Sequence, residues 1–316
     1  MSFRSVLVLI AAVAAAQQPG PKDMPQEMVW VDRSGEVLSR VGAVQNSIFF
    51  PEISPDGKWI TVSARDGELN DRDVWIHSTA DGAKKPLNVV KGNDNFPIWS
   101  PDGKEILFTS SRSGNYDLYR KRLGTDEPEQ RVIALESADY PRTWSPDGKS
   151  VIYTQAIKDR NLFMLHLAGS EPRSERLFPD ISAWQEGARI SPNGKYVAYV
   201  SNADGPFEVY VASVADPKQR WKVSRVLANG WAGGGGQPRW RKDGRELFYV
   251  MGNDTVMSVE VETEAAFRAG EPKRLFAVLG MRGNFPEEAP WLQKYDVTPD
   301  GQRFVFVRTV AKQQPQ

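Results

Sequence analysis

The residues Ser54-Pro55-Asp56-Gly57-Lys58 recur in close copies along the chain, and this repetition is the strongest signal of the architecture. The other copies begin at Ser100, Ser145, Ser191, Arg241 and Thr298, so the steps between copies are 46, 45, 46, 50 and 57 residues. Every copy keeps a glycine at the fourth position, and every copy has Asp or Asn before it. Proline fixes the first turn angle, Asp or Asn bonds its own backbone, and glycine takes the left-handed conformation without steric cost. Each copy therefore predicts a tight turn between two antiparallel strands.

Large apolar residues occupy matching positions around these turns. The strand before each turn ends in Ile53, Trp99, Trp144, Ile190, Trp240 or Val297. The strand after each turn alternates apolar and polar residues, which is the pattern of a strand with two different faces. A third and a fourth short strand follow in most repeats. Four antiparallel strands in about 46 residues are typical of one blade of a β-propeller.

In this scheme, strands from the two ends of the chain together form one blade. The last repeat supplies only two strands before Val310, whereas residues 28–32 and 36–41 form a strand pair ahead of the first repeat. We therefore predict an all-β, six-bladed β-propeller over residues 28–310, followed by a tail at 311–316. Its last blade combines two N-terminal with two C-terminal strands, so that the ring closes without an exposed strand edge.

The first residues predict export. Arg4 is followed by an apolar run from Ser5 to Ala16 and then by Gln17-Gln18-Pro19-Gly20, which is typical of a secretory signal peptide. We expect cleavage after Ala16, with residues 17–27 as a flexible lead-in. The alternative is a buried N-terminal helix. The sequence thus predicts a periplasmic or secreted protein that is not inserted in a membrane after cleavage.

The composition excludes several functions. The full chain of 316 residues has 40 basic and 40 acidic residues, and removal of Arg4 leaves 39 against 40. Such a balance gives no electrostatic reason to bind nucleic acid. With no cysteine, disulfides and thiolate chemistry are impossible, and two histidines are too few for a histidine-rich metal site. No Gly-x-Ser-x-Gly elbow of the hydrolase type is present.

The repeats resemble those of the TolB-like six-bladed propellers of bacteria, through the Trp-Ser-Pro-Asp-Gly-Lys stretches that begin at Trp99 and Trp144. Three further stretches resemble propellers found C-terminal to bacterial Ser/Thr kinases. They are residues 29–33 (VWVDR), 237–240 (QPRW) with 244–249 (GRELFY), and 295–297 (YDV) with 300–304 (DGQRF). The resemblance covers about residues 28–310 and implies the fold firmly and a function only in outline.

One end of the predicted ring carries the short turns, and the other, loop-rich end carries the longer connections between blades. Functional residues of propellers are expected at the loop-rich end or in the channel mouth. Residues just before the innermost strands should rim the channel there, and they comprise Asp94, Asn95, Asp139, Tyr140, Gln185, Glu186, Gln237 and Lys294, with Trp184, Trp231 and Trp291 nearby. Carboxylates, amides and indole rings suit a peptide or a glycan. The alternative is that the Asp and Asn residues cap turns and the Trp residues shield the blade ends.

A second set of positions lies one residue before the apolar end of each innermost strand. It comprises Glu52, Ile98, Thr143, Arg189, Arg239 and Asp296. The four charged members could form a charged channel floor for an ionic ligand. Pairing across blades, Arg239 with Asp296, is the interpretation we favour, because an unpaired buried charge is costly.

No cofactor is expected, although an all-oxygen calcium site remains as an alternative. The acidic stretch from Asp66 to Asp73 has the oxygen ligands that calcium prefers, but without EF-hand spacing. The leading functional hypothesis is a monomeric, exported, non-enzymatic binding module for an envelope protein or peptide, or for a glycan, on its loop-rich face. The rival hypothesis is an envelope enzyme of the lyase, lactonase or glycosidase type, with carboxylates or calcium at the channel mouth.

Overall fold

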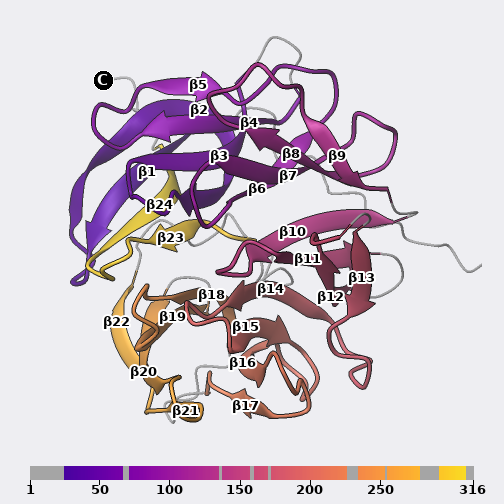
Figure 1. The fold of residues 1–316 in the computed structure, drawn as a ribbon. Helices are drawn as coiled ribbons and strands as arrows, with labels where there is room; N and C mark the ends of the chain where they lie inside the picture. The colour runs from indigo at the N-terminus through magenta and orange to yellow at the C-terminus, as the bar shows by residue number, and fades with distance from the viewer. Residues whose placement is uncertain are drawn as a thin grey trace, which may run out of the picture.

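The computed structural model describes residues 25–66, 71–134, 137–156, 160–169, 172–225, 234–252, 255–277 and 292–310. Within these ranges the chain forms 24 strands and no helix, and the sheets stand around a central axis (Figure 1). It follows that no helix of the described ranges is long and apolar enough to span a membrane. The predicted all-β propeller is confirmed.

Three sheets contain four antiparallel strands each, in chain order. The first holds β6 (Asp94–Trp99), β7 (Glu105–Ser110), β8 (Asp117–Arg122) and β9 (Gln130–Ile133). The second holds β10 (Ala138–Trp144), β11 (Ser150–Ala156), β12 (Arg160–His166) and β13 (Arg173–Arg176). The third holds β14 (Gln185–Ile190), β15 (Tyr196–Ser201), β16 (Glu208–Ser213) and β17 (Arg220–Lys222).

A fourth sheet has an additional short strand. It comprises β18 (Gly235–Trp240), β19 (Glu246–Met251), β20 (Thr255–Glu262), β21 (Arg268–Ala269) and β22 (Lys273–Ala277). The first half of β20 pairs with β22, and its last two residues pair with β21. The long strand β20 therefore extends beyond the blade as a small hairpin.

The remaining sheet has seven strands and joins the two ends of the chain. Its order is β23 (Tyr295–Val297), β24 (Arg303–Thr309), β1 (Pro25–Asp32), β2 (Val37–Ile53), β3 (Trp59–Arg65), β4 (Asp73–Ser78) and β5 (Lys84–Pro86). Strand β1 pairs with β24 over its whole length, for example Trp30 with Val305, so the predicted closure by N- and C-terminal strands is confirmed. The first part of the 17-residue β2 pairs with β1 and its last part with β3.

Division of this sheet at β2 gives the six units of the sequence prediction. Because the strand pairing itself forms five sheets, the count of six stays an interpretation.

The start of the propeller lies earlier than predicted. Strand β1 begins at Pro25, so residues 25–27, which we expected in a flexible lead-in, belong to the sheet. Glu27 is buried, and its carboxylate contacts Arg40 Nε and Arg308 Nη2 at 2.7 Å each. Two cations on neighbouring strands therefore hold this segment in place.

The six repeated turns form as predicted. Their glycines have φ between 69° and 74°, the left-handed region that favours glycine. In the turn of Asp102, Oδ1 accepts hydrogen bonds from Ser100 Oγ at 2.7 Å and from Lys104 N at 3.1 Å. Each turn is thus held by the side chain that the repeat conserves among its copies.

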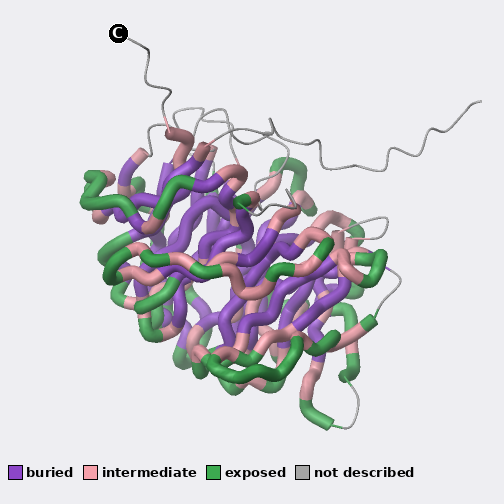
Figure 2. Tube along the Cα trace, turned by 90° about the horizontal axis from the view of Figure 1, so that it is seen from above, coloured by how far each residue is buried: buried purple, intermediate pink, exposed green. Residues whose placement is uncertain are grey.

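The core lies between neighbouring sheets. The buried strands run between two ends covered by exposed turns and loops (Figure 2). The in-register tyrosines Tyr153, Tyr199 and Tyr249 are among the largest fully buried side chains. Burial of these aromatic side chains between sheets is a large favourable contribution to the stability of the propeller.

Candidate functional site: the axial channel

The innermost strands bulge as they approach the axis. The pairing register shifts in β2, β6, β10, β14 and β18, between Asn95 and Ile98 in β6 for example. At the bulges, Phe50, Phe96 and Gln237 have positive φ values of 54°, 55° and 56°. Residues other than glycine rarely adopt this backbone conformation, and such backbone strain is concentrated at functional sites. Bulges also redirect side chains, and here the bulged residues line the channel.

A small chamber lies at the bulges, towards the loop-rich end. Phe50, Phe96 and Gln237 line it together with Arg142, Arg189 and Arg239, and its volume is about 10 Å³. That is the space of about one water molecule. We call it the loop-side chamber. Three arginines and two aromatic residues therefore line a space with room for about one water molecule.

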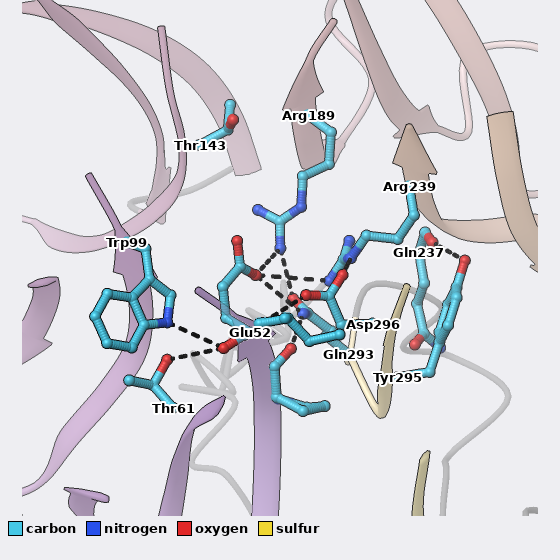
Figure 3. A network of polar contacts seen from close by, with 12 residues as sticks. Glu52, Thr61, Trp99, Thr143, Arg189, Gln237, Arg239, Gln293, Tyr295 and Asp296 are labelled. Atoms are coloured by element: carbon cyan, nitrogen blue, oxygen red, sulfur yellow. Dashed lines mark hydrogen bonds and ion pairs between the residues drawn. The ribbon is translucent and has the colours of Figure 1, made fainter. Parts of the chain in front are cut away.

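A layer of polar side chains crosses the channel next to this chamber (Figure 3). We call it the axial layer, and its members are Glu52, Arg189, Arg239, Gln293 and Asp296. Arg189 Nη2 donates to Glu52 Oε2 at 2.9 Å and to Gln293 Oε1 at 2.8 Å. Arg239 Nε donates to Asp296 Oδ1 at 2.8 Å. The four charged positions of the sequence prediction thus lie together, and Arg239 and Asp296 form the ion pair that we favoured.

Burial changes the titration of this layer. Desolvation raises the pKa of Glu52, which the cation of Arg189 partly offsets. Burial also lowers the pKa of Arg189 to about 10, and the second cause is the like charge of Arg239. The two guanidinium groups therefore repel each other, although two carboxylates stand beside them.

Tryptophans at strand ends join neighbouring innermost strands. Trp99 Nε1 donates to the Glu52 carbonyl at 3.1 Å, and Trp240 Nε1 donates to the Arg189 carbonyl at 2.9 Å. These bonds fix the backbone that carries two members of the axial layer. The large apolar ends of the innermost strands therefore position the charged site as well as the core.

The predicted channel rim is wrong in one respect: most of its polar residues are buried, not exposed. Asp94, Asp139 and Glu186 are each 0% exposed. Asp94 accepts from Arg112 Nη2 at 2.8 Å, and Glu186 contacts Arg142 and Arg160 at 2.5 Å each. A buried carboxylate requires such partners. Glu186 thus joins β14 to the neighbouring sheet, and the three buried carboxylates form no open acidic rim.

The other predicted rim residues also have internal partners. Asn95 Oδ1 accepts from Arg72 Nη1 at 3.3 Å, and Gln185 Nε2 donates to the Ala183 carbonyl at 3.0 Å. Gln237 Oε1 accepts from the Lys294 backbone N–H at 3.0 Å. Trp231 and Trp291 lie outside the described residues.

Lysine 294, also predicted at the rim, is buried. Its Nζ donates to the Ile48 carbonyl at 2.8 Å and lies 3.5 Å from the centre of the Phe49 ring. Burial holds the pKa of this amine well below its usual value. The side chain thus contributes packing between β2 and the segment before β23.

A continuous series of aromatic rings and guanidinium groups follows the loop-rich end. We call it the aromatic–arginine belt, and its members in order are Arg72, Phe49, Phe50, Phe96, Arg142, Tyr140, Arg160 and Trp184. Ring centres of Phe50 and Phe96 are 3.9 Å apart, and those of Phe96 and Tyr140 are 4.7 Å apart. Arg160 lies over both Tyr140 and Trp184, at 5.9 Å and 5.8 Å. Several members, Phe49, Tyr140 and Trp184 among them, are only half-buried. Of this belt, the sequence analysis identified Tyr140 and Trp184.

The described residues contain no group of three or more His, Asp or Glu side chains placed to hold a metal ion. In the stretch considered for calcium, Asp66 pairs with Lys84 and residues 67–70 lie outside the described ranges. His77 is buried, bonds Gln45 Oε1 at 2.9 Å, and has its pKa lowered by burial to about 4. His166 instead contacts Glu175 at 2.8 Å on the surface.

The model of the TolB beta propeller domain family matches residues 26–224, which is more than half of the chain. The chain belongs to the TolB beta-propeller domain family. The structure of a putative TolB from Agrobacterium tumefaciens superposes with a TM-score of 0.68 at 18% identity, over 92% of this chain and 99% of that one. At such identity the likeness shows the fold alone.

Two curated relatives of this TolB-family chain match over parts of their length. The Tol-Pal system protein TolB of Alcanivorax borkumensis is 27% identical over 90 residues, which are 28% of this chain and 20% of the relative. An uncharacterized peptidase of Bacillus subtilis, YuxL, is 26% identical over 211 residues, which are 64% of this chain and 30% of the relative. The chain thus spans less than a third of each of these relatives.

Proposed function

We propose that this TolB-family propeller is a binding module of the cell envelope, which engages a protein or peptide through its loop-rich end. The signal-like residues 1–16, which lie outside the described ranges, support export to the periplasm or beyond. The fold of the family supports a binding role without naming a partner.

The aromatic–arginine belt is the observation that carries this proposal. Trp, Tyr and Arg are the residues most enriched at the energetic centres of protein interfaces. In the belt such side chains are held rigid by mutual stacking, as Arg142 is over Phe96 at 4.7 Å. A rigid, half-buried aromatic surface loses little entropy on binding, so its contact area converts efficiently to affinity. Stacking on the same rings would also suit a glycan.

The channel beneath the belt supports surface docking over threading. The loop-side chamber holds about 10 Å³, and the axial layer closes it on the side away from the loops. An extended peptide would have to break the buried Arg239–Asp296 pair to pass. A partner is therefore expected to dock on the belt and insert at most one side chain.

The enzymatic alternative has less support. Of the carboxylates among the former rim candidates, Asp94 is paired with Arg112, Glu186 is paired with Arg142 and Arg160, and Asp139 accepts from Ser137 Oγ, and all three are buried. A general acid or base needs access to a substrate proton, and these buried groups offer none. We therefore propose binding as the function of this end.

The belt can be tested with one double variant and one matched control. Tyr140→Ala with Trp184→Ala removes two belt rings, whereas Trp59→Ala removes a 38% exposed ring at the turn end. The three purified proteins would be cross-linked to envelope extract, and the partner recovered would be titrated by calorimetry. We expect each belt ring to contribute about 2 kcal/mol, the scale of an interface hot spot, and the Trp59 variant to bind normally. Equal partner binding by all three folded proteins would refute the proposal.

A further inference from the structure

A second cavity lies on the other side of the axial layer, towards the six repeated turns. Its volume is about 280 Å³. We call it the turn-side cavity. Its base is the charged face of Glu52, Asp296, Arg189 and Arg239, which are also part of the axial layer. This volume is close to the lower end of the range for small-molecule sites.

The walls of the turn-side cavity are apolar. Its mouth is formed by the turn prolines Pro55, Pro192 and Pro299, and below them stand Ile53, Ile190 and Val297. An apolar wall with a few convergent polar groups at the base is the usual construction of a ligand pocket. The shape favours a ligand with a small apolar body and one polar end.

Two buried donors of the axial layer, on arginines that line this cavity, have no acceptor among the described residues. They are Arg189 Nε and Arg239 Nη2. Arg189 is 9% exposed and Arg239 is 5% exposed. Arg239 Nη2 lies 4.0 Å from Glu52 Oε2, beyond hydrogen-bond distance. A buried charged donor without a partner is costly, and an acceptor bound between the two guanidinium groups would relieve both that cost and their mutual repulsion.

The mouth of the cavity adds a third cation. In the turn that begins at Arg241, Lys242 occupies the position that proline holds in the other five turns. Its backbone N–H donates to the Pro299 carbonyl at 3.1 Å, which fixes this turn beside the next one. The Lys242 side chain is exposed and also borders an open groove between the two turns. The groove is lined by two cations, Arg241 and Lys242, and by two carboxylates, Asp243 and Asp300, and of these four charged side chains only Lys242 also lines the cavity.

We propose that the turn-side cavity binds a carboxylate with a small apolar body, its oxygens between Arg189 Nε and Arg239 Nη2. The planar carboxylate matches guanidinium donors in geometry. Glu52 and Asp296 in the same base would repel a doubly charged phosphate more than a singly charged carboxylate. The carboxylate can come from a free small acid or from the C-terminus of a peptide, and both sources present the same group.

The first experiment separates charge from shape. Purified protein would be titrated by calorimetry with 4-methylpentanoate and with 4-methylpentanamide, which has the same body without the charge. We expect saturable binding of the acid and at least about tenfold weaker binding of the amide, the scale of a charge-assisted hydrogen bond. Equal binding of the two, or no binding of the acid at millimolar concentration, would overturn the proposal.

A second arm distinguishes the two sources. A tripeptide that ends in leucine would be compared with its C-terminal amide and with the free acid. Tighter binding of the acid-ended peptide than of 4-methylpentanoate assigns the site to a chain terminus. Tighter binding of the free acid assigns it to a small metabolite-like acid.

Three variants test whether the acid binds in this cavity or elsewhere on the protein. Arg239→Lys keeps the charge but loses the planar fork, and we expect it to weaken acid binding about tenfold or more. Lys242→Gln, on the exposed mouth, should weaken it about twofold to fivefold without affecting folding. Lys104→Gln removes another exposed lysine, from a turn that does not line the cavity, and this variant should bind the acid normally. Indistinguishable binding by the Lys242 and Lys104 variants would count against the site even if the Arg239 variant failed to fold.

Discussion

Arg239 and Asp296 form a buried ion pair that joins three innermost strands at the closure of the ring. Arg239 Nε donates to Asp296 Oδ1 at 2.8 Å, and Asp296 Oδ2 accepts from the Ile53 backbone N–H at 2.7 Å. Strands β18, β23 and β2 are thus linked through one carboxylate. The closure of the propeller therefore depends on a polar contact at the axis as well as on the β1–β24 pairing.

Removal of this carboxylate should destabilise the whole ring. Asp296→Ala leaves the Arg239 charge and the Ile53 N–H buried without their partner, and we expect a loss of about 3–5 kcal/mol in the free energy of unfolding. Urea denaturation followed by tryptophan fluorescence measures it. Asp126→Ala, at an exposed position, serves as control and should change stability by less than about 0.5 kcal/mol. A loss of similar size in both variants would argue that the axial pair contributes nothing.

The sequence predicted four members of the axial layer because each repeat could be counted back from its turn. It missed Arg142, which lines the loop-side chamber, because the count selected only the residue one position before each apolar strand end. In β10 that residue is Thr143, which pairs with Ile152 as Glu52 pairs with Thr61 and Arg239 pairs with Phe248. Arg142 lies between Pro141 and Thr143, where the register of β10 shifts, and turn-anchored counting cannot detect a side chain that a bulge redirects.

The rim prediction failed for a different reason. The repeat pattern predicted the correct end of the ring for Asp94, Asp139 and Glu186. It did not predict that their side chains are buried. Their arginine partners come from irregular or neighbouring parts of the chain: Arg112, the partner of Asp94, lies in the loop after β7, and Arg160, a partner of Glu186, begins β12 of the neighbouring sheet. A repeat pattern fixes the strands, whereas contacts between irregular loops depend on side-chain packing that no period describes.

Asp139 should make stability depend on pH. Burial, with a contribution from nearby Asp117, raises the pKa of Asp139 to about 7. Because this lies above the ordinary pKa of an unfolded aspartate, folding takes up a proton between about pH 4 and pH 7, and stability falls as the pH rises through that range. Asp139→Asn keeps an acceptor for Ser137 Oγ and carries no charge. We expect it to be more stable than the original protein at pH 8, by on the order of 2–4 kcal/mol.

Thermal unfolding at pH 5 and pH 8 measures this dependence. Asp147 provides the opposite case, because hydrogen bonds from Ser145 and from the Lys149 backbone lower its pKa. Asp147→Asn should therefore lose stability at neutral pH rather than gain it. A pH dependence unchanged by Asp139→Asn would show that this carboxyl is not the group that titrates.

Ser47 should be a position where glycine stabilises the protein. It lies in the irregular part of β2 with φ of 53°, which costs a residue with a Cβ atom about 1 kcal/mol. Ser47→Gly should raise the free energy of unfolding by up to about 1 kcal/mol. Ser39→Gly, in the same strand at a position without a positive φ, should lower it by about 0.5–1 kcal/mol. Urea denaturation of both variants tests the sign, and a loss in both would mean that Ser47 carries no strain.

The repeated turns allow backbone strain to be separated from packing. Gly148 and Gly301 occupy equivalent turns with φ of 71° and 70°, but a Cβ at Gly148 would meet no atom within 4 Å, whereas one at Gly301 would lie 2.8 Å from Arg241 Cδ. Arg241 is held by Asp243 at 2.7 Å and Glu246 at 2.8 Å, so it cannot move without loss of these contacts. We expect Gly148→Ala to cost about 1–2 kcal/mol, the backbone term alone, and Gly301→Ala to cost at least about 1 kcal/mol more. Urea denaturation gives both values, and equal costs would show that Arg241 yields freely and that only the left-handed turn selects glycine.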